Sequence, residues 1–283
     1  MTILVTGGNG QLGCSLRLAS AESNHRYIFT DVKELDIVSS VAVEEFFERE
    51  KVDVVVNCAA YTAVDLAEEE EIIADYINHH AVENLAEACK RHNATLIHIS
   101  TDYVFSGEAD TPYNEECAPA PINAYGRTKL AGEKAVAKSG CKSIILRTSW
   151  LYSEFGRNFC KTMQSLTASR PEIKVVADQI GTPTYAGDLA AAIIYIIEQN
   201  LLDKCGIYHY SNEGVCSWYD FACEIARLSG NNECEIKPCT TADYPTKAQR
   251  PRYSVLDKSK FVATFRFSIP EWHDSLKECI AKM

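Results

Sequence analysis

The sequence predicts an α/β protein built on a doubly wound parallel sheet, followed by a smaller region of mixed structure. In the first half, short runs of Val, Ile and Leu alternate with longer segments of helical periodicity. The short runs are continuously apolar, as expected for strands that are buried on both faces. Regular alternation of strand and helix favours parallel strands joined by right-handed crossovers. The carboxyl ends of the strands then share one edge of the sheet, where ligands bind.

The elements follow in order along the chain. Predicted strands of the first half occupy residues 3–5, 27–29, 52–57, 95–99 and 143–146. The helices between them are predicted at residues 11–19, 41–50, 75–92 and 123–138, the last ending at Gly140, a favourable C-cap residue. The second half contains predicted helices at 158–168, 187–198 and 218–229, and a predicted strand at 173–176. Prolines interrupt the chain beyond residue 237, and part of this half is expected to return and complete the sheet.

Composition limits the functional classes. The chain has 283 residues, 46% hydrophobic and 24% charged, with a net charge of −11. A surface this acidic disfavours nucleic-acid binding. No apolar run approaches the ~20 residues that span a bilayer, and the first seven residues lack the features of a signal peptide, so a cytoplasmic protein is expected. The twelve cysteines contain no Cys-x-x-Cys pair, which favours buried free thiols over disulfides or a zinc site.

A glycine-rich turn follows the first strand and opens the first helix. Gly7, Gly10 and Gly13 have the spacing at which a tight turn brings backbone N–H groups and a helix N-terminus against a pyrophosphate. Strand, turn, helix and strand in this order predict a Rossmann-type dinucleotide site. Asp31, which ends the second strand, can bind the adenosine ribose and would repel a 2′-phosphate, favouring NADH over NADPH. Lys33 weakens that preference.

Tyr125 and Lys129 form a candidate catalytic pair. They stand at positions i and i+4 and therefore share one face of a helix. A phenol has an ordinary pKa of about 10, and a nearby ammonium is expected to lower it towards the range of a useful general acid. Thr101, at the end of the fourth strand, can hydrogen-bond the same carbonyl oxygen. Asn78 is a candidate anchor for a proton-relay water, with a helix-surface amide as the alternative.

Two further features remain open at this stage. The small residues that follow the third strand, 57–61, suit a cofactor lying flat on the backbone, although helix packing also uses small residues. The acidic run at 68–71 is interpreted as a solvated helix start favoured by the helix dipole, rather than a cation site.

Together these residues resemble the extended short-chain dehydrogenase/reductase family. The matching segments span nearly the whole chain and comprise residues 7–13, 54–65, 97–105, 123–133, 146–152, 178–184, 250–251 and 254–257. Within them, Ser-Thr-Asp-Tyr-Val-Phe at 100–105 and Arg-Thr-Ser-Trp at 147–150 discriminate far better than the glycines. The segment that begins Asn57-Cys58 departs slightly from the family pattern, a change that should be tolerated.

The resemblance implies reduction of the 4-keto group of dTDP-4-dehydro-L-rhamnose by NADH or NADPH. Tyr125 would donate the proton, Lys129 would tune it, and Thr101 would polarise the keto group. The implied cofactor residues are Gly7, Gly10, Gln11, Leu12, Gly13, Asp31, Asp36, Ile37, Ala60, Tyr61, Thr62, Tyr125 and Lys129. Thr101, Asp102 and Trp150 would contact the sugar.

The resemblance also implies residues 1–149 as the dinucleotide-binding domain and 150–283 as mainly a substrate-binding region. Some family members form homodimers bridged by a magnesium ion, but no motif here tests this, and no metal ligand is assigned. Two alternatives remain. A nucleotide-sugar epimerase or dehydratase would keep the Tyr-Lys pair, although a dehydratase would need an acidic pair near Thr101. A non-catalytic regulatory subunit should have lost Tyr125 or Lys129, and both are present.

Overall fold

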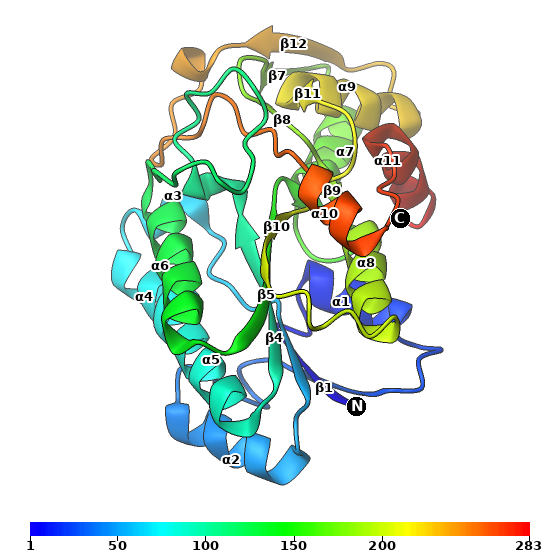
Figure 1. The fold of residues 1–283 in the computed structure, drawn as a ribbon. Helices are drawn as coiled ribbons and strands as arrows, with labels where there is room; N and C mark the ends of the chain where they lie inside the picture. The colour runs from blue at the N-terminus through cyan, green and yellow to red at the C-terminus, as the bar shows by residue number, and fades with distance from the viewer.

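A six-stranded parallel sheet forms the centre of the molecule, in the order β10-β5-β4-β3-β1-β2 (Figure 1). The computed structural model describes residues 1–283. The strands are β1 (Thr2–Thr6), β2 (Arg26–Thr30), β3 (Val54–Asn57), β4 (Thr95–Thr101), β5 (Lys142–Thr148) and β10 (Gly206–His209). Every neighbouring pair is parallel. The predicted α/β fold with a parallel sheet is therefore confirmed.

Both faces of the sheet are covered by helices, which is why its strands are continuously apolar. Along β1, Ile3 and Val5 belong to one core cluster and Leu4 to the other, because successive side chains point to opposite faces. The first cluster also takes side chains from α1 (Gln11–Ala19), α8 (Ala186–Glu198) and α10 (Ser259–Phe265). The second takes them from α2 (Ser40–Glu50), α5 (Ala81–His92) and α6 (Ala124–Ser139).

The helix predicted at 75–92 starts earlier and contains a π-turn. It consists of α4 (Glu71–Asp75), a π-helical segment (Tyr76–His80) and α5, in unbroken succession. Asn78 lies in the π-turn and is fully buried. Its side chain accepts from Tyr61 N at 2.9 Å and donates to Tyr61 O and Thr128 Oγ1, both at 3.1 Å. The alternative of a surface amide is therefore wrong, since Asn78 fastens the chain after β3 to α6.

The second half builds a smaller layer above the carboxyl edge of the sheet (Figure 1). Its helices are α7 (Phe159–Ser169), α9 (Trp218–Leu228) and α11 (Trp272–Ala281). Its strands form the short pairs β7–β12, β6–β9 and β8–β11. Their bounds are β6 (Leu151–Tyr152), β7 (Glu172–Val176), β8 (Ile180–Gly181), β9 (Thr184–Tyr185), β11 (Cys216–Ser217) and β12 (Glu235–Cys239). A third core cluster joins these elements. The predicted domain boundary at 149/150 remains a prediction.

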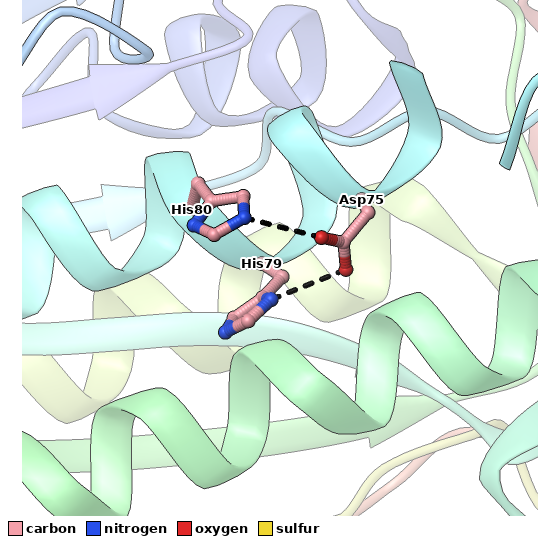
Figure 2. A group of neighbouring side chains, drawn as sticks. All are labelled: Asp75, His79 and His80. Carbon is pink, nitrogen blue, oxygen red and sulfur yellow. Dashed lines mark hydrogen bonds and ion pairs between the residues drawn. The ribbon is translucent and has the colours of Figure 1, made fainter. Parts of the chain in front are cut away.

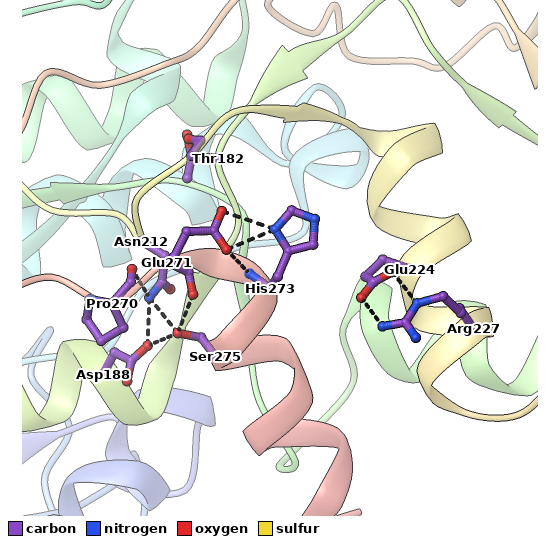
Figure 3. A network of polar contacts seen from close by, with 10 residues as sticks. Thr182, Asp188, Asn212, Glu224, Arg227, Pro270, Glu271, His273 and Ser275 are labelled. Carbon is purple, nitrogen blue, oxygen red and sulfur yellow. Dashed lines mark hydrogen bonds and ion pairs between the residues drawn. The ribbon is translucent and has the colours of Figure 1, made fainter.

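A buried polar network holds the C-terminal helix against α8 (Figure 3). Asn212 Nδ2 donates to Asp188 Oδ2 at 2.6 Å and to Ser275 Oγ at 2.8 Å. Asn212 Oδ1 accepts from the backbone N–H of Tyr185 at 2.7 Å. The network joins α8, the loop after β10, and α11, so it fixes the smaller layer to the sheet.

Two further predictions concern the state of the cysteines and the absence of a membrane-spanning segment. All twelve cysteines are free thiols, as predicted, but only Cys89, Cys160, Cys216, Cys234 and Cys279 are buried, and Cys205 is exposed. None of the helices combines the length and the apolar character that crossing a bilayer requires.

Candidate active site

A cavity of about 920 Å³ lies between the carboxyl edge of the sheet and the smaller layer. The glycine turn, the ends of β3 and β4, the start of α6 and the segment after β5 all contribute to its lining. The smaller layer contributes residues from α7, β7 and the loop after β12. Among the predicted site residues, the cavity brings together Gly7, Gly10, Gln11, Leu12, Gly13, Ala60, Thr62, Thr101, Asp102, Tyr125, Lys129 and Trp150.

The turn at 7–13 has the close packing that only glycine permits. Gly7 has a φ of +64°, and a Cβ there would lie 2.7 Å from Ala59 N. A Cβ on Gly13 would lie 2.3 Å from Gly7 O. Helix α1 begins directly after the turn, without a side-chain cap or an acidic residue in its first turn. Its free N–H groups therefore fit the pyrophosphate of a dinucleotide.

Tyr125 and Lys129 reach the cavity from the first turns of α6. The side chain of Asn123 caps this helix by accepting from Gly126 N at 2.8 Å. Gly126 is required because a Cβ there would lie 2.2 Å from Tyr103 O. These two contacts fix the start of α6 against the end of β4, which sets the position of both functional side chains.

The electrostatics of the pair differ from the expectation. Burial raises the pKa of Tyr125 to about 12, with the neighbouring Thr101 hydroxyl opposing the shift. The predicted lowering by Lys129 is not found, and the Lys129 ammonium donates to Ile99 O at 2.6 Å. Burial also lowers the pKa of Lys129 to about 8, with the charge of Glu133 opposing the shift. The phenol is therefore protonated at neutral pH.

Thr101 and Asp102 complete the polar side of this part of the cavity. Thr101 Oγ1 donates to Asp102 Oδ1 at 3.0 Å and accepts from Tyr103 N at 3.2 Å. Asp102 Oδ2 is buried without a partner in the protein, and burial raises the pKa of this carboxyl to about 6. An unpaired buried oxygen is costly unless a ligand supplies a donor, so this atom is suited to a substrate hydroxyl.

Trp150 also lines the cavity, and its backbone conformation is strained. Its φ is +48°, which is unfavourable for a bulky residue. One side of its indole lies close to Gly181, where a Cβ would come within 2.6 Å of the ring. The ring also stacks on Trp218, with ring centroids 3.6 Å apart. Trp218 lies on α9 and was not predicted as a site residue, because only the fold places it against Trp150.

Four predicted cofactor residues do not line the cavity. Asp31 and Asp36 lie in the loop after β2, where their carboxylates accept from the backbone of that loop. Ile37 is packed in the core on the α2 side of the sheet. Tyr61 points its hydroxyl to Glu70 Oε2 at 2.7 Å. Their roles towards the cofactor remain predictions.

Comparison with known proteins identifies the family. The model of the RmlD substrate binding domain matches residues 1–283. The chain belongs to the RmlD substrate binding domain family. A relative from Aggregatibacter actinomycetemcomitans, named dTDP-4-dehydrorhamnose reductase, is 43% identical over 284 residues, covering 97% of each protein. The resemblance stated from the sequence is thus confirmed.

Two solved structures agree with this RmlD-family assignment. A dTDP-4-dehydrorhamnose reductase from Clostridium acetobutylicum superposes with a TM-score of 0.96 at 45% identity, covering 100% of this chain and 99% of that one. A dTDP-4-dehydrorhamnose reductase from Bacillus anthracis, solved in complex with NADP, superposes with a TM-score of 0.93 at 38% identity. It likewise covers 100% of this chain and 99% of its own.

In this RmlD-family chain the cavity is locally basic although the protein is acidic. Lys129, Arg157, Lys174 and Arg250 line it, against only two carboxylates. Arg250 is paired with Asp65 at 2.6 Å, whereas Arg157 and Lys174 form no ion pair. Unpaired cations favour an anionic ligand. Sequence reasoning missed them because lysine and arginine are common on any surface.

A buried ion pair joins β5 to α6 and was also missed. Arg147 on β5 donates to Glu133 on α6 at 2.9 and 2.6 Å, and both side chains are at most 4% exposed. Ser100 Oγ donates to the same carboxylate. Glu133 lies one turn beyond Lys129 on α6. The spacing of Tyr125, Lys129 and Glu133 at intervals of four residues could have indicated that Glu133 lies on the same face of the helix as the pair.

The acidic run at 68–71 is mostly exposed at the start of α4, as predicted for a solvated helix start, and its carboxylates also make polar contacts. Glu68 accepts from Ala124 N at 2.7 Å, and Glu71 pairs with Arg127 at 2.9 Å. Glu69 pairs with Lys247, and Glu70 accepts from Tyr61 as described above. Glu68 and Glu71 therefore contact the start of α6, whereas Glu69 and Glu70 contact the loop after β12 and the segment after β3.

Proposed function

We propose that this protein reduces the 4-keto group of dTDP-4-dehydro-L-rhamnose to give dTDP-L-rhamnose, with NADH or NADPH as reductant. The observation that carries the proposal is the meeting of Tyr125, Thr101 and the glycine turn in one locally basic cavity. The names of the full-length relatives support the substrate, and the NADP complex of the Bacillus anthracis relative supports the class of cofactor.

The chemistry assigns a role to each side chain. A reduced nicotinamide cofactor, held by the glycine turn and Lys129, would supply the hydride for C4 of the sugar. Tyr125 transfers its phenolic proton to the carbonyl oxygen, which becomes the hydroxyl of the product, and the raised pKa of the phenol keeps that proton in place beforehand. Thr101 orients the same oxygen. Lys129 presents a positive charge beside the site and holds the cofactor ribose.

We assign recognition of the nucleotide sugar to other residues that line the cavity. Asp102 Oδ2 accepts from a sugar hydroxyl, and Trp150 packs against the sugar. Arg157 and Lys174 lie free to pair with the diphosphate. Asp31 is expected to favour NADH by repelling a 2′-phosphate. The NADP complex of the Bacillus anthracis relative argues against that preference. The proposal includes a cytoplasmic location, as expected from the sequence, and a homodimer, as the family resemblance implies.

The deciding experiment is a coupled assay with both reduced cofactors. Purified protein given dTDP-4-dehydro-L-rhamnose should consume one reduced cofactor per alcohol formed. The Tyr125→Phe variant should lose about 10²–10⁴-fold in turnover while still binding cofactor, because it lacks only the proton donor. Absence of cofactor oxidation by folded protein would refute the reductase proposal. Retention of activity in Tyr125→Phe would remove that residue from its role.

An epimerase is the second candidate, since it would use the same pair of side chains. It would change the configuration of a nucleotide sugar without net consumption of cofactor. Product formation without loss of reduced cofactor would therefore favour the epimerase.

A further inference from the structure

We propose that the outer side of the π-turn binds a divalent transition-metal ion, with Zn²⁺ as the best match, through Asp75, His79 and His80. These residues lie away from the candidate active site on the long helix that runs from α4 into α5 (Figure 2). Their ligand atoms all lie within 4.8 Å of one another. The proposal is independent of the proposed reductase function.

The geometry suits a single ion. His79 Nδ1 lies 3.1 Å from Asp75 Oδ1, and His80 Nε2 lies 3.2 Å from Asp75 Oδ2. Zinc takes nitrogen and oxygen ligands at roughly 2.0–2.2 Å, so neighbouring ligands around a tetrahedral ion stand about 3.3–3.5 Å apart. The three ligand atoms lie within 4.8 Å of one another and would draw together around the ion, with water in the fourth position.

The π-turn explains why two adjacent histidines reach one carboxylate. In an α-helix, residue i+4 lies above residue i, whereas residue i+5 points well away from it. Here Ala81 N–H donates to Tyr76 O, five residues back, which widens the turn. His79 and His80 both reach Asp75 from the next turn, and their rings stack on each other (Figure 2). The same widened turn presents Asn78 to the interior.

The surroundings favour a cation. Glu83 Oε2 lies 3.9 Å from His80 Nδ1, the ring nitrogen that does not face Asp75. A carboxylate on the second nitrogen of a ligating imidazole orients the ring and increases its basicity. The side chains are partly accessible, at 35% for Asp75, 29% for His79 and 47% for His80, so an ion can enter from solvent.

The first test is a calorimetric titration of the full-length protein with Zn²⁺, comparing the wild type with single variants. The twelve free cysteines can also bind zinc, so the difference between proteins is the measurement. His79→Ala and His80→Ala should each weaken one equivalent of binding by at least about tenfold, since even outer partners of a zinc ligand contribute that much. His273→Ala is the control, because His273 pairs with Glu271 at 2.8 Å but has no second imidazole nearby.

Hydrogen exchange supplies the second readout. Zn²⁺ should slow exchange of the amides of residues 76–81 in the wild type and in His273→Ala, but not in His80→Ala. Equal zinc affinity in the wild type and both π-turn variants would overturn the proposal. An equal loss of binding in His273→Ala would do the same, since it would show that any surface histidine suffices.

Discussion

Replacing Arg147 by methionine should strongly destabilise the protein. The substitution leaves the Glu133 carboxylate in the interior with Ser100 as its remaining side-chain donor. Removing one partner of a buried pair costs about 3–5 kcal/mol, because the other charge stays desolvated. The expected unfolding entropy of a 283-residue chain is about 0.6 kcal/mol/K, so the melting temperature should fall by roughly 5–8 °C.

Scanning calorimetry of two matched variants tests the reasoning. Arg227→Met removes a similar bidentate pair with Glu224 on the solvent-exposed side of α9, and should leave the melting temperature nearly unchanged (Figure 3). The double variant Arg147→Met/Glu133→Leu should recover most of the lost stability, because it removes the orphaned charge as well. A fall of less than about 2 °C for Arg147→Met, or a double variant no more stable than Arg147→Met, would refute the argument.

Three further outcomes are expected. Gly13→Ala should weaken binding of the reduced cofactor at least about tenfold in a fluorescence titration, because the new methyl group would lie 2.3 Å from Gly7 O; unchanged affinity would contradict the close-packed turn. The value of kcat/KM should fall as pH rises above about 8, since Lys129 then loses the charge that holds the cofactor; a flat profile to pH 10 would count against that role. Trp218→Ala should raise KM for the nucleotide sugar about two- to tenfold with little change in kcat, because aromatic stacking of about 0.5–1.5 kcal/mol no longer holds Trp150; an unchanged KM would show that Trp150 needs no such support.

Periodicity and turn chemistry predicted the sheet well. The strands from β1 to β5 and helices α1, α2 and α6 lie within a few residues of their expected places. These elements have strong local signals, such as the cap at Asn123 and Gly140 at the end of α6. Strand β10, helix α10 and helix α11 were not located, because their form depends on partners distant in sequence.

In the site, too, contiguous motifs could be predicted from the sequence, whereas contacts between distant residues could not. The glycine turn and the Tyr125–Lys129 pair are contiguous motifs, so the chain itself indicates them. The π-turn at 76–80 has no such signal, because the tertiary contacts of Asn78 with Tyr61 and Thr128 accompany it. The stacking of Trp218 on Trp150 and the pairing of Arg147 with Glu133 likewise require the complete fold.

The position of β10 has a consequence for synthesis of the chain. Strand β5 ends at Thr148, but β10, which pairs with it, does not begin until Gly206. During translation the sheet therefore has an open edge at β5 until β10 leaves the ribosome, and helix α8, which covers the adjacent face, also arrives late. Open strand edges recruit other strands. A nascent chain from which β5 but not yet β10 has emerged should consequently aggregate or require a chaperone, even though its glycine turn and its Tyr125–Lys129 pair are already synthesised.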